Sequence, residues 1–119
     1  MFPYVRAVAI DCNDLEAQAR FWCALLGMKI TEREDDGWYE LEPMSDHGPV
    51  LCLQEVPETK TTKNRIHLDL AVPDFQTAGE RARALGATLR NRSDCGTFEV
   101  WQDPEGNEFC FVCNHPTPA

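Results

Sequence analysis

The sequence predicts an α+β fold in which two βαβββ modules follow one another along the chain. Three observations support this prediction. The chain of 119 residues fits one domain. Its hydrophobic pattern runs through one strand, one helix and three strands and then starts again. The second run also repeats sequence features of the first. We expect a single domain over residues 1–119, with module 1 over about 4–56, a linker over 57–64 and module 2 over about 65–114.

The first module begins with RAVAIDCN (6–13), where Val8 and Ile10 give the alternation of a strand with one buried face. Asn13 or Asp14 can cap the helix that follows, and Gly27 can end it in a left-handed conformation. Turn residues then separate three strand candidates, MKITERED (28–35), GWYELEP (37–43) and PVLCLQEV (49–56).

The second module follows a polar stretch, PETKTTKN (57–64), that has no apolar period and predicts a linker. RIHLDLAVPD (65–74) predicts a strand, and DFQTAGERARALG predicts a helix that ends at Gly86. In the strand, Ile66, Leu68 and Leu70 are expected to face the helices. Three further strands are expected at ATLRNRS (87–93), TFEVWQD (97–103) and NEFCFVCN (107–114).

An internal repeat relates the two halves. Three pairs of positions match in order, namely Asp14 with Asp74, Gly27 with Gly86, and Gly48 with Gly106. The offset between the halves drifts only from 60 to 58 residues. A match that keeps its order over both halves indicates a repeated structural unit.

Composition excludes several function classes. A net charge of -9 and a pI near 4.6 oppose binding to nucleic-acid phosphates or anionic lipid. No apolar run approaches the length of a membrane span or of a secretion signal, so we expect a soluble cytoplasmic protein. The 6 cysteines are then expected to be reduced. Cys110 and Cys113 lie three residues apart on a predicted strand, where they point to opposite faces and do not form a chelate.

The residues that carry a family resemblance are HLDLAVPD at the start of module 2, LGA at the end of its helix and DPEGNEFCF (103–111) near its end. The chain resembles the glyoxalase / bleomycin-resistance / dioxygenase superfamily, also called vicinal oxygen chelate, and in particular its glyoxalase-like branch. The resemblance implies a cupped eight-stranded mixed sheet with helices outside, a central pocket and a divalent metal held by four inward residues.

The four positions that the resemblance assigns to the metal depart from the usual ligands. His67 fits, but its counterpart in module 1 is Ala7, which has no donor atom. The two last-strand positions fall on Cys52 and Cys110, four residues after Gly48 and Gly106, where carboxylates or amides are usual. Thiolates suit zinc, whereas carboxylates suit magnesium, manganese or iron.

Two interpretations of the site remain open. His67, Cys52 and Cys110 can converge as a three-ligand zinc site with an open position. Alternatively the cysteines are small apolar wall residues and no metal binds. In that case strand alternation places the ligand-binding wall at Gln54, His67, Asp69, Trp101, Glu108 and Cys110. His67 is the candidate general acid or base.

Two functions follow. The first is a glyoxalase-like small-molecule-binding protein with a degenerate metal site, and we expect no metal in it. The second is a metal-dependent lyase, isomerase or dioxygenase-type enzyme of the same superfamily. Classical glyoxalase I activity is disfavoured because the metal quartet is incomplete. The expected partners are a small molecule and a second copy of the chain in a homodimer, with no nucleic acid and no membrane.

Overall fold

A computed structural model describes residues 1–113 of the chain. The chain divides into two compact units, Met1–Thr59 and a second unit that begins at Lys60. This division falls inside the stretch expected to be the linker. The expected end of the last strand at Asn114 lies outside the described residues. No helix within residues 1–113 is long and apolar enough to cross a membrane.

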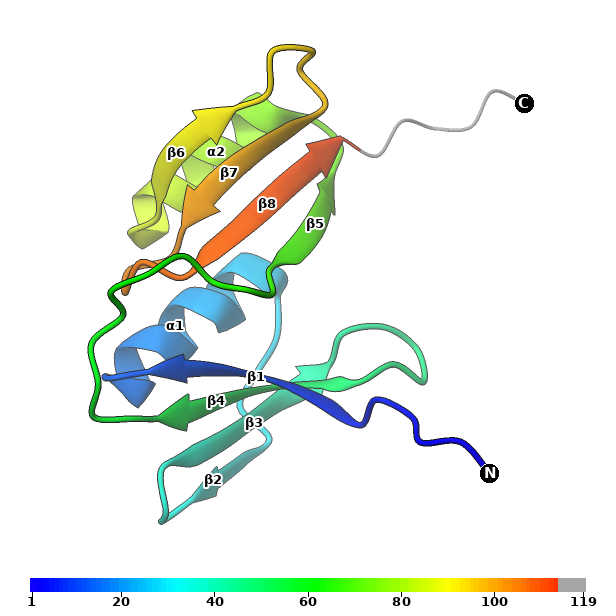
Figure 1. Cartoon of the computed structure of the whole chain (residues 1–119), viewed down its shortest axis with the longest axis vertical. Coiled ribbons are helices and arrows are strands. Elements are labelled where there is room, and N and C mark those ends of the chain that lie inside the picture. The colour runs from blue at the N-terminus through cyan, green and yellow to red at the C-terminus, as the bar shows by residue number, and fades with distance from the viewer. Residues whose placement is uncertain (114–119) are drawn as a thin grey trace. The chain divides into compact units, whose positions relative to one another are not determined.

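The first unit contains one helix and one four-stranded mixed sheet (Figure 1). Its sheet has the order β1-β4-β3-β2, in which β1 and β4 run parallel and the other neighbours run antiparallel. The elements in chain order are β1 (Ala7–Cys12), α1 (Leu15–Leu26), β2 (Glu32–Glu34), β3 (Trp38–Pro43) and β4 (Val50–Glu55).

The second unit repeats this topology, with the sheet order β5-β8-β7-β6 and the parallel pair β5 and β8. Its elements are β5 (Leu68–Val72), α2 (Phe75–Leu85), β6 (Thr88–Arg92), β7 (Phe98–Gln102) and β8 (Glu108–Cys113). The predicted α+β class and paired βαβββ modules are confirmed. Over residues 1–113 the strands form two separate four-stranded sheets.

The helix ends follow the predicted repeat. Asp14 accepts a hydrogen bond from the Ala17 backbone N–H at 3.1 Å, and Asp74 accepts one from the Thr77 N–H at 2.7 Å. Each bond satisfies a backbone donor that the first turn of a helix leaves without a partner. Gly27, with a φ of 68°, ends α1 in the left-handed region that favours glycine.

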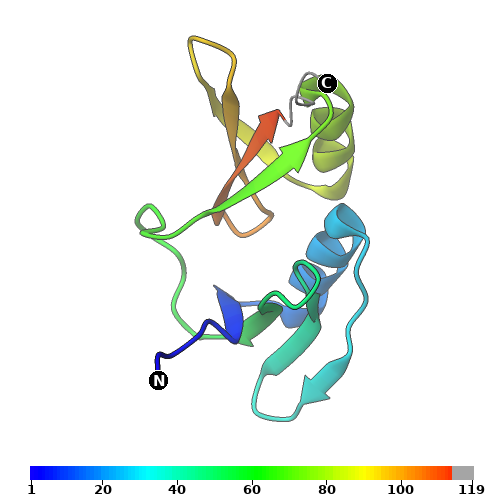
Figure 2. The ribbon, with the colours of Figure 1, turned by 90° about the vertical axis from the view of Figure 1, so that its right-hand side faces the viewer.

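Each helix covers one face of its own sheet (Figure 2), and the opposite face, which that helix does not cover, is termed the open face below. In the second unit, Trp101 lies opposite Phe109 in the β7–β8 ladder, and Val100 lies opposite Cys110. Because side chains alternate along a strand, these two pairs point to opposite faces. Trp101 and Phe109 are buried on the face that α2 covers, where Trp101 approaches Gly79 of the helix. Cys110 therefore lies on the open face.

The strand expected over 65–74 is shorter in the structure. β5 begins at Leu68, where pairing with Phe109 of β8 begins. Ile66 precedes this ladder and is 81% exposed, so the prediction that it faces a helix is wrong. Residues ahead of the ladder have no partner strand to fix their alternation.

The strand expected over 28–35 is also shorter, since β2 spans only Glu32–Glu34. The residues before it are held by other bonds. The Met28 N–H donates to the Cys23 carbonyl at the end of α1, and the Lys29 N–H donates to the Glu42 carboxylate over 2.8 Å. These bonds use the backbone groups that a longer strand would need for its ladder.

Candidate functional site

A cluster of three polar side chains lies on the open face of the second unit. Asp69 of β5 lies directly opposite Cys110 of β8, and His67 lies one residue before β5. Potential metal-ligand atoms of these three residues all lie within 4.8 Å of one another. His67 lies ahead of the β5–β8 ladder, and the observed contact between its side chain and that of Asp69 brings the two residues together.

The charge distribution of the cluster centres on Asp69. His67 Nε2 lies 3.1 Å from Asp69 Oδ1, and the two side chains are 42% and 58% exposed. Cys110 is buried by contrast. Burial raises the pKa of the Cys110 thiol, the Asp69 charge and a hydrogen bond to Asp69 raise it further, and Lys63 opposes them. The thiol therefore remains protonated at neutral pH and donates to the carboxylate.

Glu108, also expected on this wall, anchors the segment that leads into β5. Its carboxylate accepts from Lys60 Nζ and from the Asn64 backbone N–H, both over 2.9 Å. Only 10% of the Glu108 side chain is exposed. Burial raises the pKa of Glu108, but the Asn64 amide and the Lys60 ammonium outweigh it and hold the pKa below its ordinary value. Glu108 is therefore an ionised anchor, and both of its oxygens are occupied.

Two of the predicted site residues belong to the first unit. Cys52 is buried, and Gln54 is exposed two residues further along β4. Burial, followed by the charge of Glu40, raises the pKa of the Cys52 thiol. The register repeats that of the second unit, because Cys52 lies opposite Ala9 as Cys110 lies opposite Asp69. In the first unit the residue directly opposite the thiol is thus Ala9, and the position equivalent to His67 is Ala7, so neither supplies a donor atom.

The predicted wall also included Trp101, and the structure corrects this placement. Trp101 is 1% exposed and lies on the face of the sheet that α2 covers, opposite to that of Cys110. Its indole Nε1–H donates to Glu99 over 3.1 Å. An indole on this side contributes to the core of the unit and does not line the open face.

Sequence reasoning did not find the polar group on the helix-covered face. There Glu99 is bonded to Trp101 and to Arg92, and Arg83 lies over the indole ring. The available signal was the alternation of TFEVWQD, which puts Glu99 and Trp101 on one side of the strand. A buried acid next to a tryptophan requires a partner, and the sequence offers several arginines nearby.

The residues present do not reproduce the metal quartet that the resemblance implies. Ala7 has no donor atom, and Cys52 and Cys110 stand at the two positions where the resemblance implies carboxylates or amides. The donors that do come together are His67, Asp69 and Cys110, a mixed nitrogen, oxygen and sulfur set. Such a set suits zinc better than magnesium or manganese.

Repeated βαβββ units with a polar cluster on one open sheet face define the class of the protein. The chain belongs to the glyoxalase-like domain family, whose model matches residues 7–112. The resemblance to the glyoxalase / bleomycin-resistance / dioxygenase superfamily is thereby confirmed.

Known relatives share the fold at low sequence identity. Glyoxalase 1 of Caenorhabditis elegans is 25% identical over 128 residues, covering 92% of this chain and 42% of the relative. The chain thus spans under half the length of that curated protein. The structure of a glyoxalase-related enzyme from Fulvimarina pelagi matches with a TM-score of 0.74 at 21% identity, covering 99% of this chain and 94% of that one. The fosfomycin resistance protein FosX of Listeria monocytogenes, solved with Mn(II) and dihydroxypropylphosphonic acid, matches with a TM-score of 0.74 at 14% identity, covering 94% and 90%.

Proposed function

We propose that the chain is a small-molecule-binding protein whose ligand contacts His67, Asp69 and Cys110 and that it works without a metal. The observation that carries this proposal is the bonding around Asp69. The carboxylate receives the His67 Nε2 group at 3.1 Å and the protonated thiol of Cys110. Asp69 thus has polar partners within the protein, and its side chain is 58% exposed, so water can solvate its charge without a bound cation.

The chemistry of the cluster favours a small oxygenated ligand. With Nε2 of His67 committed to Asp69, the imidazole has Nδ1 left, which accepts a hydrogen bond when neutral and donates one when protonated. A ligand hydroxyl or carbonyl can pair with this nitrogen in either state. His67 can also move a proton at Nδ1, with Asp69 as its positioning residue.

Elemental analysis of protein purified without chelator tests the metal-free proposal. We expect no metal, or much less than one equivalent. Thermal melting with added zinc, nickel, manganese or iron is expected to show no shift. A bound metal would stabilise the fold by about 2.7 kcal/mol at a hundredfold excess over Kd, so binding would be evident. One tightly held equivalent that is lost in both His67→Ala and Asp69→Asn would overturn the proposal.

Ligand binding is tested separately by NMR titration of the labelled chain with small hydroxy acids, diols and ketones. We expect at least one such compound to shift the resonances of His67 and of the β5 amides. The shift should be lost in His67→Ala and retained in His47→Ala, a matched change in the first unit. Equal binding by both variants would show that the ligand does not contact the cluster of His67, Asp69 and Cys110.

The second candidate function is a metal-dependent lyase, isomerase or dioxygenase-type enzyme. It is favoured by one observation, the presence of His67, Asp69 and Cys110 ligand atoms within 4.8 Å of one another. A divalent ion held there would supply electrophilic polarisation of a substrate oxygen. In that case Cys110→Ser should reduce zinc uptake, and the elemental analysis above separates this function from the metal-free one.

A further inference from the structure

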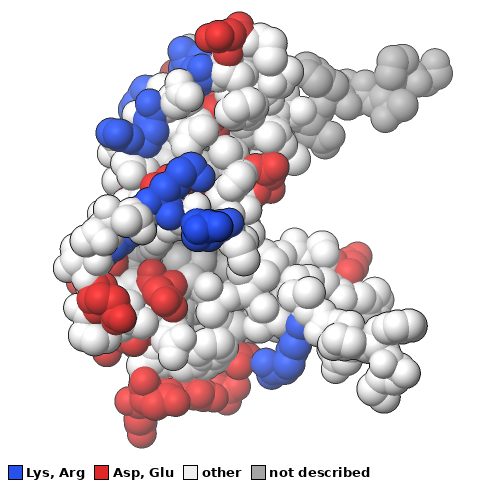
Figure 3. Space-filling view, in the orientation of Figure 1, with Lys and Arg blue, Asp and Glu red and all other residues white. Residues whose placement is uncertain are grey.

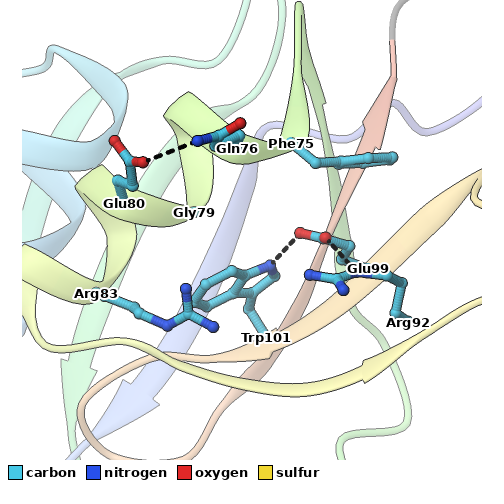
Figure 4. Close-up of a pocket in the computed structure, with 8 residues that line it drawn as sticks. All are labelled: Phe75, Gln76, Gly79, Glu80, Arg83, Arg92, Glu99 and Trp101. Carbon is cyan, nitrogen blue, oxygen red and sulfur yellow. Dashed lines mark hydrogen bonds and ion pairs between the residues drawn. The ribbon is translucent and has the colours of Figure 1, made fainter.

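The second unit has a pocket on the helix-covered side of its sheet. The His67 cluster lies on the other face of the same sheet. The pocket has a volume of about 440 Å³ and lies between α2 and the β6–β7 hairpin (Figure 4). Its walls include Phe75 and Arg83 of α2, Arg92 of β6, and Glu99 and Trp101 of β7. Volumes of this size are typical of small-molecule sites.

A β-bulge sets the direction of Arg92. Leu89 lies opposite Trp101, but the next registered pair is Asn91 with Val100, so Arg90 is an extra residue in β6. The extra residue places Arg92 opposite Glu99 on the helix-covered face, whereas regular alternation from Leu89 would have placed it on the open face. Bulges that redirect one side chain in this way are frequent next to functional sites.

The buried carboxylate of Glu99 is already satisfied. It accepts from Trp101 Nε1 over 3.1 Å and from Arg92 Nε over 2.8 Å, one bond to each oxygen. The Glu99 side chain is only 2% exposed. Its function in the pocket is therefore to hold Arg92 and Trp101, since it has little capacity left to bind a cation.

The two arginines, by contrast, retain unused donors. Arg92 uses only Nε, and its side chain is 61% exposed, which leaves its terminal amino groups accessible. Arg83 lies over the Trp101 ring with its Cζ 5.2 Å from the ring centre, and its guanidinium group makes no hydrogen bond or ion pair within residues 1–113. A guanidinium has five N–H groups in a planar fork that matches a carboxylate.

The other carboxylate of the pocket, Glu80, does not occupy the free N–H groups of the two arginines. Glu80 also lines the pocket, but it is exposed to solvent and accepts a weak hydrogen bond from the neighbouring Gln76 over 3.4 Å. Phe75, which is half-buried, adds an aromatic surface to the same pocket. The accessible chemistry is thus two guanidinium groups beside a flat apolar wall (Figure 4).

The first unit contains an acidic counterpart of about 580 Å³ beside the start of α1 and the β2–β3 hairpin. There Arg33 is already paired with Glu16, and carboxylates dominate the lining. Figure 3 shows acidic side chains gathered over this hairpin. By count, residues 1–59 hold twelve Asp or Glu and four Lys or Arg, whereas residues 60–119 hold eight and seven. A small anion is therefore repelled by the first unit but not by the second.

We propose that the pocket between α2 and the β6–β7 hairpin binds a small organic carboxylate with a flat apolar body. The carboxylate pairs with Arg83 and Arg92, and the apolar body lies against Phe75. This site is independent of the proposed ligand site around His67, because the two lie on opposite faces of the same sheet.

An NMR titration with three probes of similar shape tests the proposal. Benzoate, benzyl alcohol and benzylammonium are added to the labelled full chain up to millimolar concentration. We expect benzoate to shift the Trp101 indole N–H and the amides of α2 in a saturable manner. The neutral and cationic probes should bind at least about tenfold more weakly, since they lose the charged hydrogen bonds.

Variants then locate the binding. Arg83→Gln should weaken the binding of benzoate by about tenfold, which is the loss expected for one charged hydrogen bond. This variant is preferred to a change at Arg92, whose loss would leave a buried carboxylate short of a partner. Arg90→Gln removes a neighbouring charge that does not line the pocket and should leave affinity unchanged. Equal binding by the two variants, equal binding of benzylammonium, or no shift at Trp101 would each overturn the proposal.

Discussion

Glu99 lies directly opposite Arg92 in the β6–β7 ladder and accepts a hydrogen bond from Arg92 Nε over 2.8 Å, although only 2% of the Glu99 side chain is exposed. A carboxylate so deeply buried requires charged or polar partners, because its desolvation is costly. Here one partner comes from the next strand and the other, Trp101 Nε1, from the same strand. The pair therefore joins the edge strand β6 to the core of the second unit.

Replacing Arg92 by leucine should destabilise the protein by about 1–3 kcal/mol, because one oxygen of the buried carboxylate loses its partner. Arg90→Leu, at the exposed bulge position, should change stability by less than about 0.5 kcal/mol. Urea unfolding measures both. Adding Glu99→Gln to Arg92→Leu removes the buried charge and should recover part of the loss. If the double variant loses as much stability as Arg92→Leu and Glu99→Gln lose in total when made separately, the two side chains are not coupled.

Gly79 of α2 lies against the Trp101 indole. A Cβ added at Gly79 would come within 3.1 Å of Trp101 Cζ2 and 3.4 Å of Cη2. Alanine would favour the helix by up to about 1 kcal/mol, but overpacking typically costs about 1–3 kcal/mol. Trp101 cannot easily move, since it is buried and bonded to Glu99. We therefore expect Gly79→Ala to lower the free energy of unfolding.

The Trp101→Phe background provides the control for Gly79→Ala. Phenylalanine lacks the ring atoms that the new methyl group would meet, so Gly79→Ala should cost less in that background than in the native chain. Thermal unfolding of the four proteins completes the cycle. An equal cost in both backgrounds would show that the contact with the indole is not the cause.

Much of the backbone plan was predictable from local signals. The caps Asp14 and Asp74 and the terminator Gly27 follow from rules that involve a few adjacent residues. The alignment of Cys52 with Cys110 also agrees with the strand register. Cys52 lies opposite Ala9 of β1, and Cys110 lies opposite Asp69, the equivalent residue of β5. Such a repeat can be recognised in the sequence because both copies must pack the same elements in the same way.

The face of the sheet on which Trp101 lies was not predictable from alternation alone. Alternation separates Trp101 from Val100, but only the pairing of Trp101 with Phe109 shows which of them faces the helix. The bulge at Arg90 is a second example, since nothing in LRNR distinguishes an inserted residue from a regular one. Both features depend on register between strands, which a single sequence does not state.

Glu108 makes part of the stability pH-dependent. Its pKa is below the ordinary value of 4.5, because the Asn64 amide and the Lys60 ammonium outweigh the effect of burial. A carboxyl with a depressed folded pKa contributes stability above its ordinary pKa and loses it as pH falls through the depressed value. At pH 7 Glu108→Gln should cost about 1 kcal/mol. This cost should shrink as the pH falls below about 4.

Denaturant unfolding of wild type and Glu108→Gln between pH 7 and pH 3 measures this difference. Glu58→Gln is the matched control, since Glu58 is exposed and its side chain makes no hydrogen bond or ion pair within residues 1–113. Its effect should be small and nearly constant with pH. A constant cost for Glu108→Gln over the same range would contradict the assignment of Glu108 as an ionised anchor.

We expect the chain to form a homodimer. Each sheet has a strand at either end of its order, and a second copy would cover exposed backbone groups at such an edge. Light scattering at micromolar concentration measures the mass directly. A mass equal to that of one 13.5 kDa chain would count against the expectation.

Cys95 is expected to be the most reactive of the cysteines. It is exposed, and its sulfur lies 3.2 Å from the Thr97 hydroxyl. Hydrogen bonds from Thr97, then from Ser93 and from backbone groups, lower the pKa of the Cys95 thiol. Burial raises the pKa values of Cys52 and Cys110. Because the thiolate is the nucleophile, alkylation by iodoacetamide near neutral pH should modify Cys95 first and these two last.

Mass spectrometry of the alkylated chain measures this order, and one variant separates the two causes of reactivity. Thr97→Val keeps the shape of the side chain and the exposure of Cys95 but removes the hydroxyl donor. The pH at which Cys95 reacts at half its maximal rate should then move upward, because a thiolate that loses a donor is formed less readily. Cys95→Ser identifies the signal of this thiol. If Thr97→Val leaves the pH profile unchanged, exposure alone accounts for the reactivity, and the hydroxyl contact does not stabilise the thiolate.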